Sequence, residues 1–224
     1  MIKTIKSLIF LGSIILLLTA CQKEQFETKV DLGLNYYPLK LNAVSIYDMD
    51  STTYNEFNNS TKNYIFQLKD SVTNQFVDAV GDTSYRIERY KKTNNTWDFQ
   101  KIILRKITHN RAEEVIDNHR YVRMVFPQQK GISWNGNLYN DMDEWRYRFT
   151  AINESKQINN LTIDSTITIE QSNEINLIRE DIYYETYAKN IGLVEKTTKT
   201  VSKNINTGRI ESGYSFKMTL NNYR

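Results

Sequence analysis

Cysteine is nearly absent from this sequence, which has one such residue, Cys21, among 224. The chain beyond Cys21 therefore holds no disulfide, no cysteine nucleophile and no zinc site built on thiolates. Its stability has to come from packing. The single thiol lies directly after an apolar stretch near the N-terminus, and this position indicates a different role for it.

Glycine and proline are also scarce, with eight and two residues. Loops that cradle phosphate groups need closely placed glycines, and no P-loop, Rossmann or GxSxG pattern occurs. Turns must instead rely on Asn and Asp, which tolerate a left-handed backbone better than other side chains do. Lys and Arg form no long cluster, so we expect no nucleic-acid partner.

The N-terminus carries the most specific pattern in the chain. Lys3 and Lys6 precede an almost uninterrupted apolar run from Leu8 to Leu18. This run is shorter than the roughly 20 residues that a helix needs to cross a bilayer, and it is typical of a signal peptide. The four residues from Leu18 to Cys21 resemble the bacterial lipobox. That resemblance implies cleavage before Cys21, which becomes the new N-terminal residue and carries lipid chains such as palmitate.

Cleavage there leaves 224 − 20 = 204 residues and lowers the formal charge from +3 to +1, because Lys3 and Lys6 depart (27 − 26). This length predicts one folded domain. We expect a signal peptide at 1–20, an acylated cysteine with a polar tether at 21–31, and a single β domain at 32–224. As a flexible coil of about 10 residues, the tether spans on the order of 16 to 19 Å.

The lipid on Cys21 predicts attachment to a bacterial outer membrane. The stretch from Cys21 to Glu24 also resembles an export signal of Bacteroidetes surface lipoproteins, although Gln25 stands where that signal has another acidic residue. Periplasmic and surface-facing orientations both stay open.

Alternation with period two dominates the chain after Leu32 and predicts strands with one buried face. It is clearest at 145–150, 161–170 and 214–221, and weaker at 44–49, 64–68, 84–90, 97–107, 120–126, 182–188 and 193–202. Short Asn-rich breaks between these segments favour hairpins. A helical pattern is left only at 112–116 and 174–181. The predicted fold is mainly β, a curved antiparallel sheet of roughly ten strands that forms a sandwich or an open barrel.

Two clusters of polar residues contain side chains of the kinds that bind metal ions. His109 and His119 flank a hairpin that contains Glu113 and Glu114, a set that could hold zinc, but no HExxH-type spacing supports it. The oxygen-rich stretch from Asn137 to Glu144 lacks the glycine and spacing of an EF-hand. We therefore predict no metal site and no cofactor.

Surface contacts and modification give three further candidates. Trp134 lies in a loop-like stretch and is the best candidate for an exposed aromatic contact, such as stacking on a sugar. Ser51 and Ser71 follow aspartate in a short pattern that resembles the O-glycosylation motif of Bacteroides relatives. Ser51 is expected near a strand end. Ser165 fits the same pattern but falls on the apolar phase of its strand, so we expect it to be buried.

Four stretches, at 36–40, 85–90, 134–137 and 187–194, resemble in this order a family of Bacteroidetes cell-envelope lipoproteins to which no activity is assigned. The resemblance implies a lipobox signal peptide followed by a β-rich domain, and it transfers no site residue. Where that family has a Val-Gly-x-x-Trp stretch, this chain has Leu41 to Ser45.

Three hypotheses of function follow. The first is a lipid-anchored envelope protein whose β domain binds a partner or plays a structural part, without catalysis. The second is a carrier or sensor that holds a lipid or another apolar ligand inside a curved sheet. The third is a tethered glycan hydrolase, which needs two carboxylates in a cleft, and the sequence nominates no such pair. No catalytic residue and no particular protein or glycan partner is predicted.

Replacing Cys21 with Ala is expected to abolish acylation, because the modified atom is the cysteine sulfur. The uncleaved precursor should accumulate without lipid, and globomycin, which blocks the cleavage step, should make the unaltered chain accumulate as an uncleaved precursor as well. Immunoblots of fractionated cells measure both. An unchanged size in either experiment would show that the lipobox assignment is wrong.

Overall fold

One antiparallel sheet of twelve strands accounts for most of the chain in the computed structural model, which describes residues 31–159 and 161–224. Leu32–Arg224 forms one compact unit. The signal peptide and Cys21 lie outside the described residues. The strands are β1 (Val44–Asn55), β2 (Ser60–Val77), β3 (Thr83–Thr93), β4 (Thr96–Ile107), β5 (Arg111–Ile116), β6 (His119–Val125), β7 (Ser133–Asn135), β8 (Arg146–Ile158), β9 (Leu161–Ile175), β10 (Arg179–Ala188), β11 (Gly192–Lys203) and β12 (Ile210–Tyr223).

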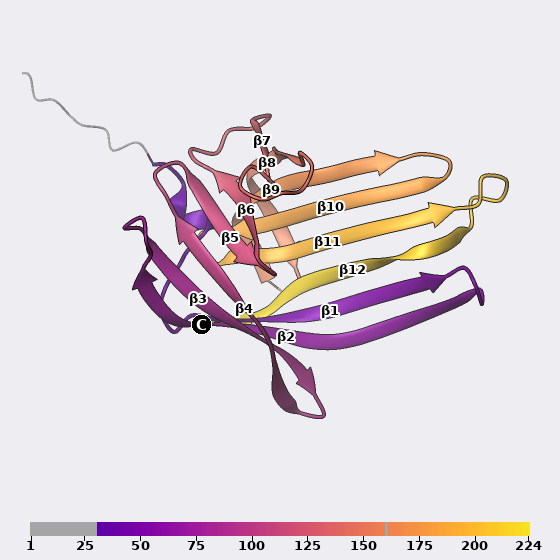
Figure 1. Cartoon of the computed structure of the whole chain (residues 1–224), viewed down its shortest axis with the longest axis horizontal. Helices are drawn as coiled ribbons and strands as arrows, with labels where there is room; N and C mark the ends of the chain where they lie inside the picture. The colour runs from indigo at the N-terminus through magenta and orange to yellow at the C-terminus, as the bar shows by residue number, and fades with distance from the viewer. Residues whose placement is uncertain (1–30, 160) are drawn as a thin grey trace, which may run out of the picture. The chain divides into compact units, whose positions relative to one another are not determined.

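The strand order is β6-β5-β4-β3-β2-β1-β12-β11-β10-β9-β8-β7, so two meanders of six strands meet where β1 pairs with β12 (Figure 1). The predicted mainly-β, antiparallel fold is confirmed. All ten predicted strands overlap observed ones, although several of the observed strands are longer, as β2 is.

Two helical predictions were wrong. Residues 112–116 lie in β5, where Glu113 and Glu114 are buried between β4 and β6. The pairing of these carboxylates with arginines overrides the high helix propensity of an Ala-Glu-Glu sequence. The segment 174–181 is a hairpin, in which β9 ends at Ile175 and β10 begins at Arg179.

Asparagine and aspartate supply the turns, as predicted. In the described part of the chain, every residue with a positive φ is Asn, Asp or Gly. Asn94 and Asn95 join β3 to β4 with φ values of 49° and 66°, and Asp117 and Asn118 join β5 to β6 with 50° and 63°. Consecutive positive φ values are the requirement of the tight hairpin turn whose twist matches that of the strands.

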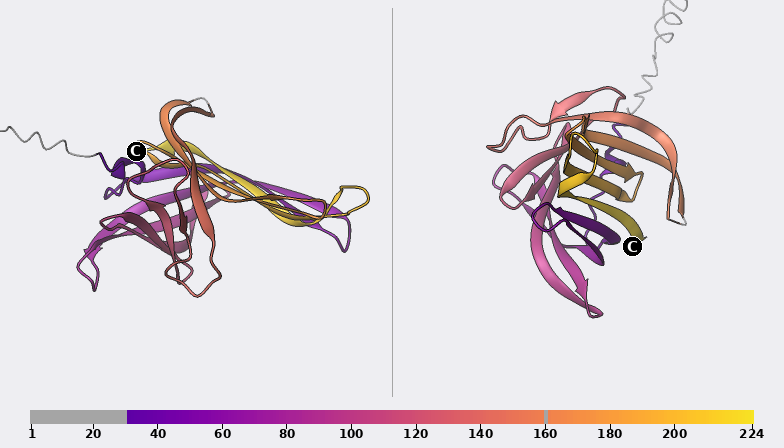
Figure 2. Two further views of the ribbon diagram at one scale, coloured as in Figure 1. Left: turned by 90° about the horizontal axis from the view of Figure 1, so that it is seen from above. Right: turned by 90° about the vertical axis from the view of Figure 1, so that its right-hand side faces the viewer.

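The sheet curls until its two edges meet, which makes it a nearly closed barrel rather than a sandwich (Figure 2). The N–H of Val122, in the edge strand β6, donates to the carbonyl of Gly136, directly after β7, at 2.9 Å. The indole Nε1–H of Trp134, in β7, donates to the carbonyl of Val122 at 2.9 Å. These bonds satisfy backbone groups that an open edge would leave unpaired.

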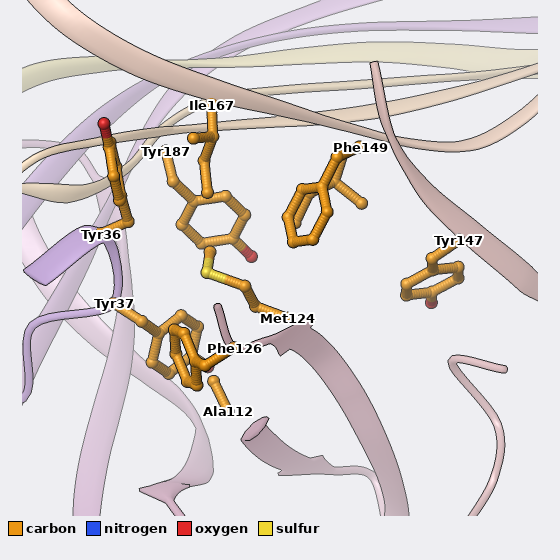
Figure 3. Close-up of a cluster of buried hydrophobic side chains, with 10 residues drawn as sticks. Tyr36, Tyr37, Ala112, Met124, Phe126, Tyr147, Phe149, Ile167 and Tyr187 are labelled. Atoms are coloured by element: carbon orange, nitrogen blue, oxygen red, sulfur yellow. The ribbon is translucent and has the colours of Figure 1, made fainter. Parts of the chain in front are cut away.

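A one-turn 3-10 helix, η1 (Leu34–Tyr36), anchors the first core cluster. Tyr36 and Tyr37 pack with Met124, Phe126 and Tyr187, among others, inside the curl (Figure 3). The phenol of Tyr36 also lies 2.6 Å from the hydroxyl of Ser165, so that η1 is tied to β9. The segment before β1 thus contributes to the core.

The second core cluster lies along β1, β2, β11 and β12 and includes Tyr47, Met49, Leu68, Val194 and Met218. The turn between β8 and β9 packs against it, and the side-chain amide of Asn159 donates to the carbonyl of Leu220 at 2.9 Å. The two clusters approach each other at Leu193, which packs against both.

We expect Gly213→Ala to lower the free energy of unfolding by about 2 to 4 kcal/mol, because an added Cβ would lie 2.1 Å from the carbonyl oxygen of Thr200 at a φ of 115°. Gly208→Ala is the control. It has a φ of 70° but no atom within 4 Å of the added Cβ, so only backbone strain of about 1 kcal/mol is expected. Urea unfolding of both variants measures the difference. Equal losses would mean that the close approach of β11 to β12 at Gly213 does not matter.

Candidate functional site

A cavity of about 430 Å³ lies within the curl of the sheet. Its walls come from β1–β6 and β10–β12, and the segment 37–43 closes one side of it. This volume falls within the range of about 300 to 1,000 Å³ that is usual for small-molecule sites. The apolar part of the wall includes Tyr47, Met49, Leu68, Val72, Ile87 and Met218.

Seven of the charged side chains in the wall form one connected set. We call this set the ionic chain, because each member contacts another: Asp70, Arg89, Arg105, Glu114, Arg123, Glu185 and Lys196. Arg89 donates from Nε and Nη2 to the two carboxylate oxygens of Asp70, both at 2.7 Å. Arg105 reaches the same carboxylate with Nη2 at 3.7 Å and donates from Nε to Glu114 at 2.7 Å.

The chain continues across the interior of the curl. Arg123 donates from Nε and Nη2 to one oxygen of Glu114, at 3.0 and 2.8 Å. Its Nη1 lies 3.7 Å from Glu185, and Lys196 donates to that carboxylate at 2.7 Å. The phenol of Tyr187 donates to the other oxygen of Glu185 at 2.7 Å. Arg123 of β6 thereby joins the first meander to β10 of the second.

The register of neighbouring strands determines where the charged residues of the ionic chain lie. Three ion pairs link residues directly opposite each other on neighbouring strands: Asp70 with Arg89, Arg105 with Glu114, and Glu185 with Lys196. On β3 and β4, Arg89 and Arg105 stand two positions after the buried residues Ile87 and Ile103. They therefore lie on the same face of the strand as these isoleucines. A bulge between Thr186 and Tyr187 puts Leu193 and Lys196 on the same wall.

The ionic chain has one positive charge more than it has negative charges. Its cations are three arginines and one lysine, and its anions are three carboxylates (4 − 3 = +1). Lys40 and Arg224, both exposed, add cationic side chains at the rim. Since interactions between charges strengthen inside a protein, the excess charge makes the interior of the cavity attractive to an anion.

Two carboxylates of the ionic chain, Glu114 and Glu185, have lowered pKa values and are ionised at neutral pH. Burial raises the pKa of Glu185, but the charges of Lys196 and Arg123 outweigh it and lower that pKa to about 2. Burial likewise opposes ionisation of Glu114, and Arg123 and Arg105 hold its pKa well below the usual range. Ion pairing dominates in both cases.

Tyr37 is the polar group in the wall that lacks a partner. Its side chain is 5% exposed, it lines the cavity, and its phenol oxygen makes no hydrogen bond within the described chain. Burial raises the pKa of this phenol well above its usual value. It therefore keeps its proton and presents an unused O–H donor beside Arg105, whose guanidinium carbon lies 5.9 Å from the ring centroid.

The residues nominated from sequence lie away from the cavity. Ser51 and Ser71 are half-buried, and Ser51 lies within β1 rather than near its end, because β1 continues to Asn55. Glycosylation at either serine stays a prediction, and acylation of Cys21 concerns residues outside the described range. Ser165, expected to be buried, is half-buried.

Trp134 is not in a loop and does not form an open platform. It lies in β7 and is half-buried, with its ring centroid 4.7 Å from that of Phe149. A three-residue strand is too short for alternation to reveal it. Trp145 packs against Tyr147, at 5.6 Å between centroids.

The two histidines do not converge. His109 follows β4 and His119 begins β6, so they lie at opposite ends of β5. Residues 31–159 and 161–224 contain no group of three or more His, Cys, Asp or Glu side chains placed to hold a metal ion.

Sequence reasoning missed the ionic chain altogether. The available sign was a charged residue in the apolar phase of a strand, such as Arg89 two positions after Ile87 or Glu185 two positions before Tyr187. Buried charges of this kind need partners, so opposite charges on several strands indicate a shared interior site. Which strands supply the partners depends on the curl of the sheet.

Comparison with solved structures gives a weak likeness. No family model and no curated protein matches the chain. A solved structure from Vibrio parahaemolyticus, named provisionally as an outer membrane lipoprotein-sorting protein domain, aligns with 81% of this chain and 84% of its own length at 11% identity, with a TM-score of 0.21. A TM-score of this size does not establish a shared fold, so the function is inferred below from this chain's own residues.

The described part of the chain also bears on membrane crossing by helices. No helix within residues 31–159 and 161–224 has the length and apolar character needed to cross a membrane.

We expect Glu185→Gln to lower the free energy of unfolding at pH 7 by about 3 kcal/mol, because Lys196 and Arg123 lose their buried counter-charge. The folded-state pKa of Glu185 is depressed from 4.5 to about 2. Its stabilising contribution is therefore complete above pH 4.5 and is lost as the pH falls through 2.

The difference in stability between Glu185→Gln and the unaltered protein should accordingly shrink between pH 5 and pH 2, as measured by urea unfolding at each pH. Glu154→Gln, at an exposed carboxylate, is the control and should stay within about 0.5 kcal/mol of the unaltered protein. A gap that stayed constant over this range would contradict the assigned ionisation.

Proposed function

We propose that this protein is a lipid-anchored envelope protein whose β domain binds a small amphiphilic ligand in the cavity, as a carrier or sensor without catalysis. The observation that carries the proposal is the cavity of about 430 Å³, with its apolar wall and its ionic chain. A fully packed interior would have excluded this kind of ligand binding. The cavity therefore favours binding over a purely structural role.

Anchoring and location are part of the same proposal and rest on the sequence. The lipobox-like stretch at Cys21 supports a location in the envelope, on the outer membrane, and the four stretches that resemble Bacteroidetes cell-envelope lipoproteins support membership of that family. The tether before Leu32 would let the β domain meet ligands at some distance from the lipid surface.

A glycan hydrolase is the less favoured alternative. Such an enzyme needs a carboxylic acid that holds a proton near neutral pH beside a second carboxylate. Glu114 and Glu185 are both in the cavity wall, but ion pairs lower the pKa of each. Neither is suited to donate a proton, and binding without chemistry fits this pair better.

Filling the cavity should abolish binding. N-phenyl-1-naphthylamine, a neutral dye that fluoresces in apolar surroundings, is expected to bind the purified β domain attached to its tether. Val72→Trp should weaken that binding about tenfold or more, because the larger side chain occupies space in the wall. Fluorescence titration measures both affinities.

Val77→Trp is the matched control, because it makes the same substitution on the same strand at a residue that is 71% exposed and does not line the cavity. It should leave dye binding unchanged. If the dye does not bind, or if both variants bind it as the unaltered protein does, the proposed ligand site is wrong.

A further inference from the structure

The wall of the cavity holds a hydrogen-bond donor that the protein itself does not use. The phenol of Tyr37 is buried, lines the cavity and makes no hydrogen bond in the described chain. A buried polar group without a partner costs stability, whereas Tyr47 and Tyr187 in the same wall donate to Leu193 and Glu185. A ligand that accepts a hydrogen bond would satisfy Tyr37.

The charges around Tyr37 indicate the charge of that acceptor. The ionic chain carries four cations and three anions, and Arg105 lies under the Tyr37 ring. Arg89 uses Nε and Nη2 on Asp70, and Arg105 uses Nε on Glu114 and turns Nη2 toward Asp70. In the described structure Nη1 of each arginine makes no hydrogen bond and is left over as a donor. An anionic acceptor would meet several donors and neutralise the excess charge.

The remainder of the wall indicates the rest of the ligand. Met49, Leu68, Phe216 and Met218 come from three neighbouring strands and form an apolar surface of the same cavity. Burying apolar surface there is favourable by roughly 25 cal/mol per Å². A polar ligand without an apolar part would leave this surface in contact with water. The ligand therefore needs an apolar part as well as a polar head group.

We propose that the cavity takes an amphiphile with one anionic head group, a carboxylate or a phosphate, which accepts a hydrogen bond from Tyr37 and offsets the positive excess of the ionic chain. This inference rests on the proposed ligand-binding function and adds the charge of the ligand and the residue that selects it. A cationic amphiphile would meet a wall that is already positive, and a neutral one would leave the excess uncompensated.

Four single-chain amphiphiles of equal length test the head group. Dodecanoate, dodecyl phosphate, dodecan-1-ol and dodecylammonium are titrated against the protein with bound N-phenyl-1-naphthylamine, and displacement of the dye gives their affinities. An anion should bind about tenfold or more tightly than the alcohol, and dodecylammonium should bind worst. Tighter binding of dodecanoate would indicate a fatty acid, and tighter binding of dodecyl phosphate would indicate a lipid phosphate.

Tyr37→Phe tests the residue, because it removes the unused O–H and keeps the ring. This variant should unfold at the same temperature as the unaltered protein or a higher one, and it should bind the dye and dodecan-1-ol normally. Its affinity for the preferred anion should fall about tenfold. Tyr64→Phe is the matched control, because it removes the same hydroxyl from a tyrosine that is 48% exposed and does not line the cavity, and it should keep the preference for an anion.

The outcomes separate the two proposals. If the dye binds and the alcohol displaces it as well as the anions do, or if Tyr37→Phe keeps the preference for an anion, the anionic ligand is overturned while the binding function stands. If neither the dye nor any amphiphile binds, both proposals fail together.

Discussion

The structure depends on a buried contact between charges on strands that are far apart in the sheet. Arg123 of β6 lies 3.7 Å from Glu185 of β10, although seven strands separate β6 from β10 in the sheet order. The contact exists only because the sheet curls through most of a barrel. It continues through Glu114 and Arg105 to Asp70, so one line of charges ties the two meanders together around the cavity.

Such a line of charges is a costly way to hold an interior together. Removing charged groups from water costs several kcal/mol for each ion, and their mutual attraction only partly repays it. A domain with apolar residues of similar size at these positions would often be as stable. The presence of this line of charges in a domain that already has two apolar clusters is better explained by function, because charged groups in the wall of a cavity make it selective for the charge of its ligand.

Much of the fold could be predicted from the sequence, because alternation and turn chemistry are local properties. Along the strand at 161–170 the isoleucines Ile163, Ile167 and Ile169 are buried and alternate with polar residues, so the pattern is visible in the sequence, and the turn at Asn94 and Asn95 needs only residues that tolerate positive φ. The strand β5 could not be recognised in this way. Its Glu113 and Glu114 are buried in spite of their charge. Glu113 pairs with Arg111 of the same strand, and Glu114 pairs with arginines on β4 and β6, which the local sequence does not reveal.

The cavity was beyond prediction for a related physical reason. Arg89, Arg105 and Arg123 belong to strands that the alternation identifies, yet nothing local states that the strands curl until the three guanidinium groups share one interior. The excess of one positive charge is a property of the assembled set, and so is the missing partner of Tyr37. Both carry a cost in the empty protein that an anion would remove. By linkage, a ligand that relieves this cost also stabilises the fold. The excess charge and the unpaired phenol make the interior less stable than an apolar one would be. They would therefore also be the reason that the cavity binds an anionic ligand.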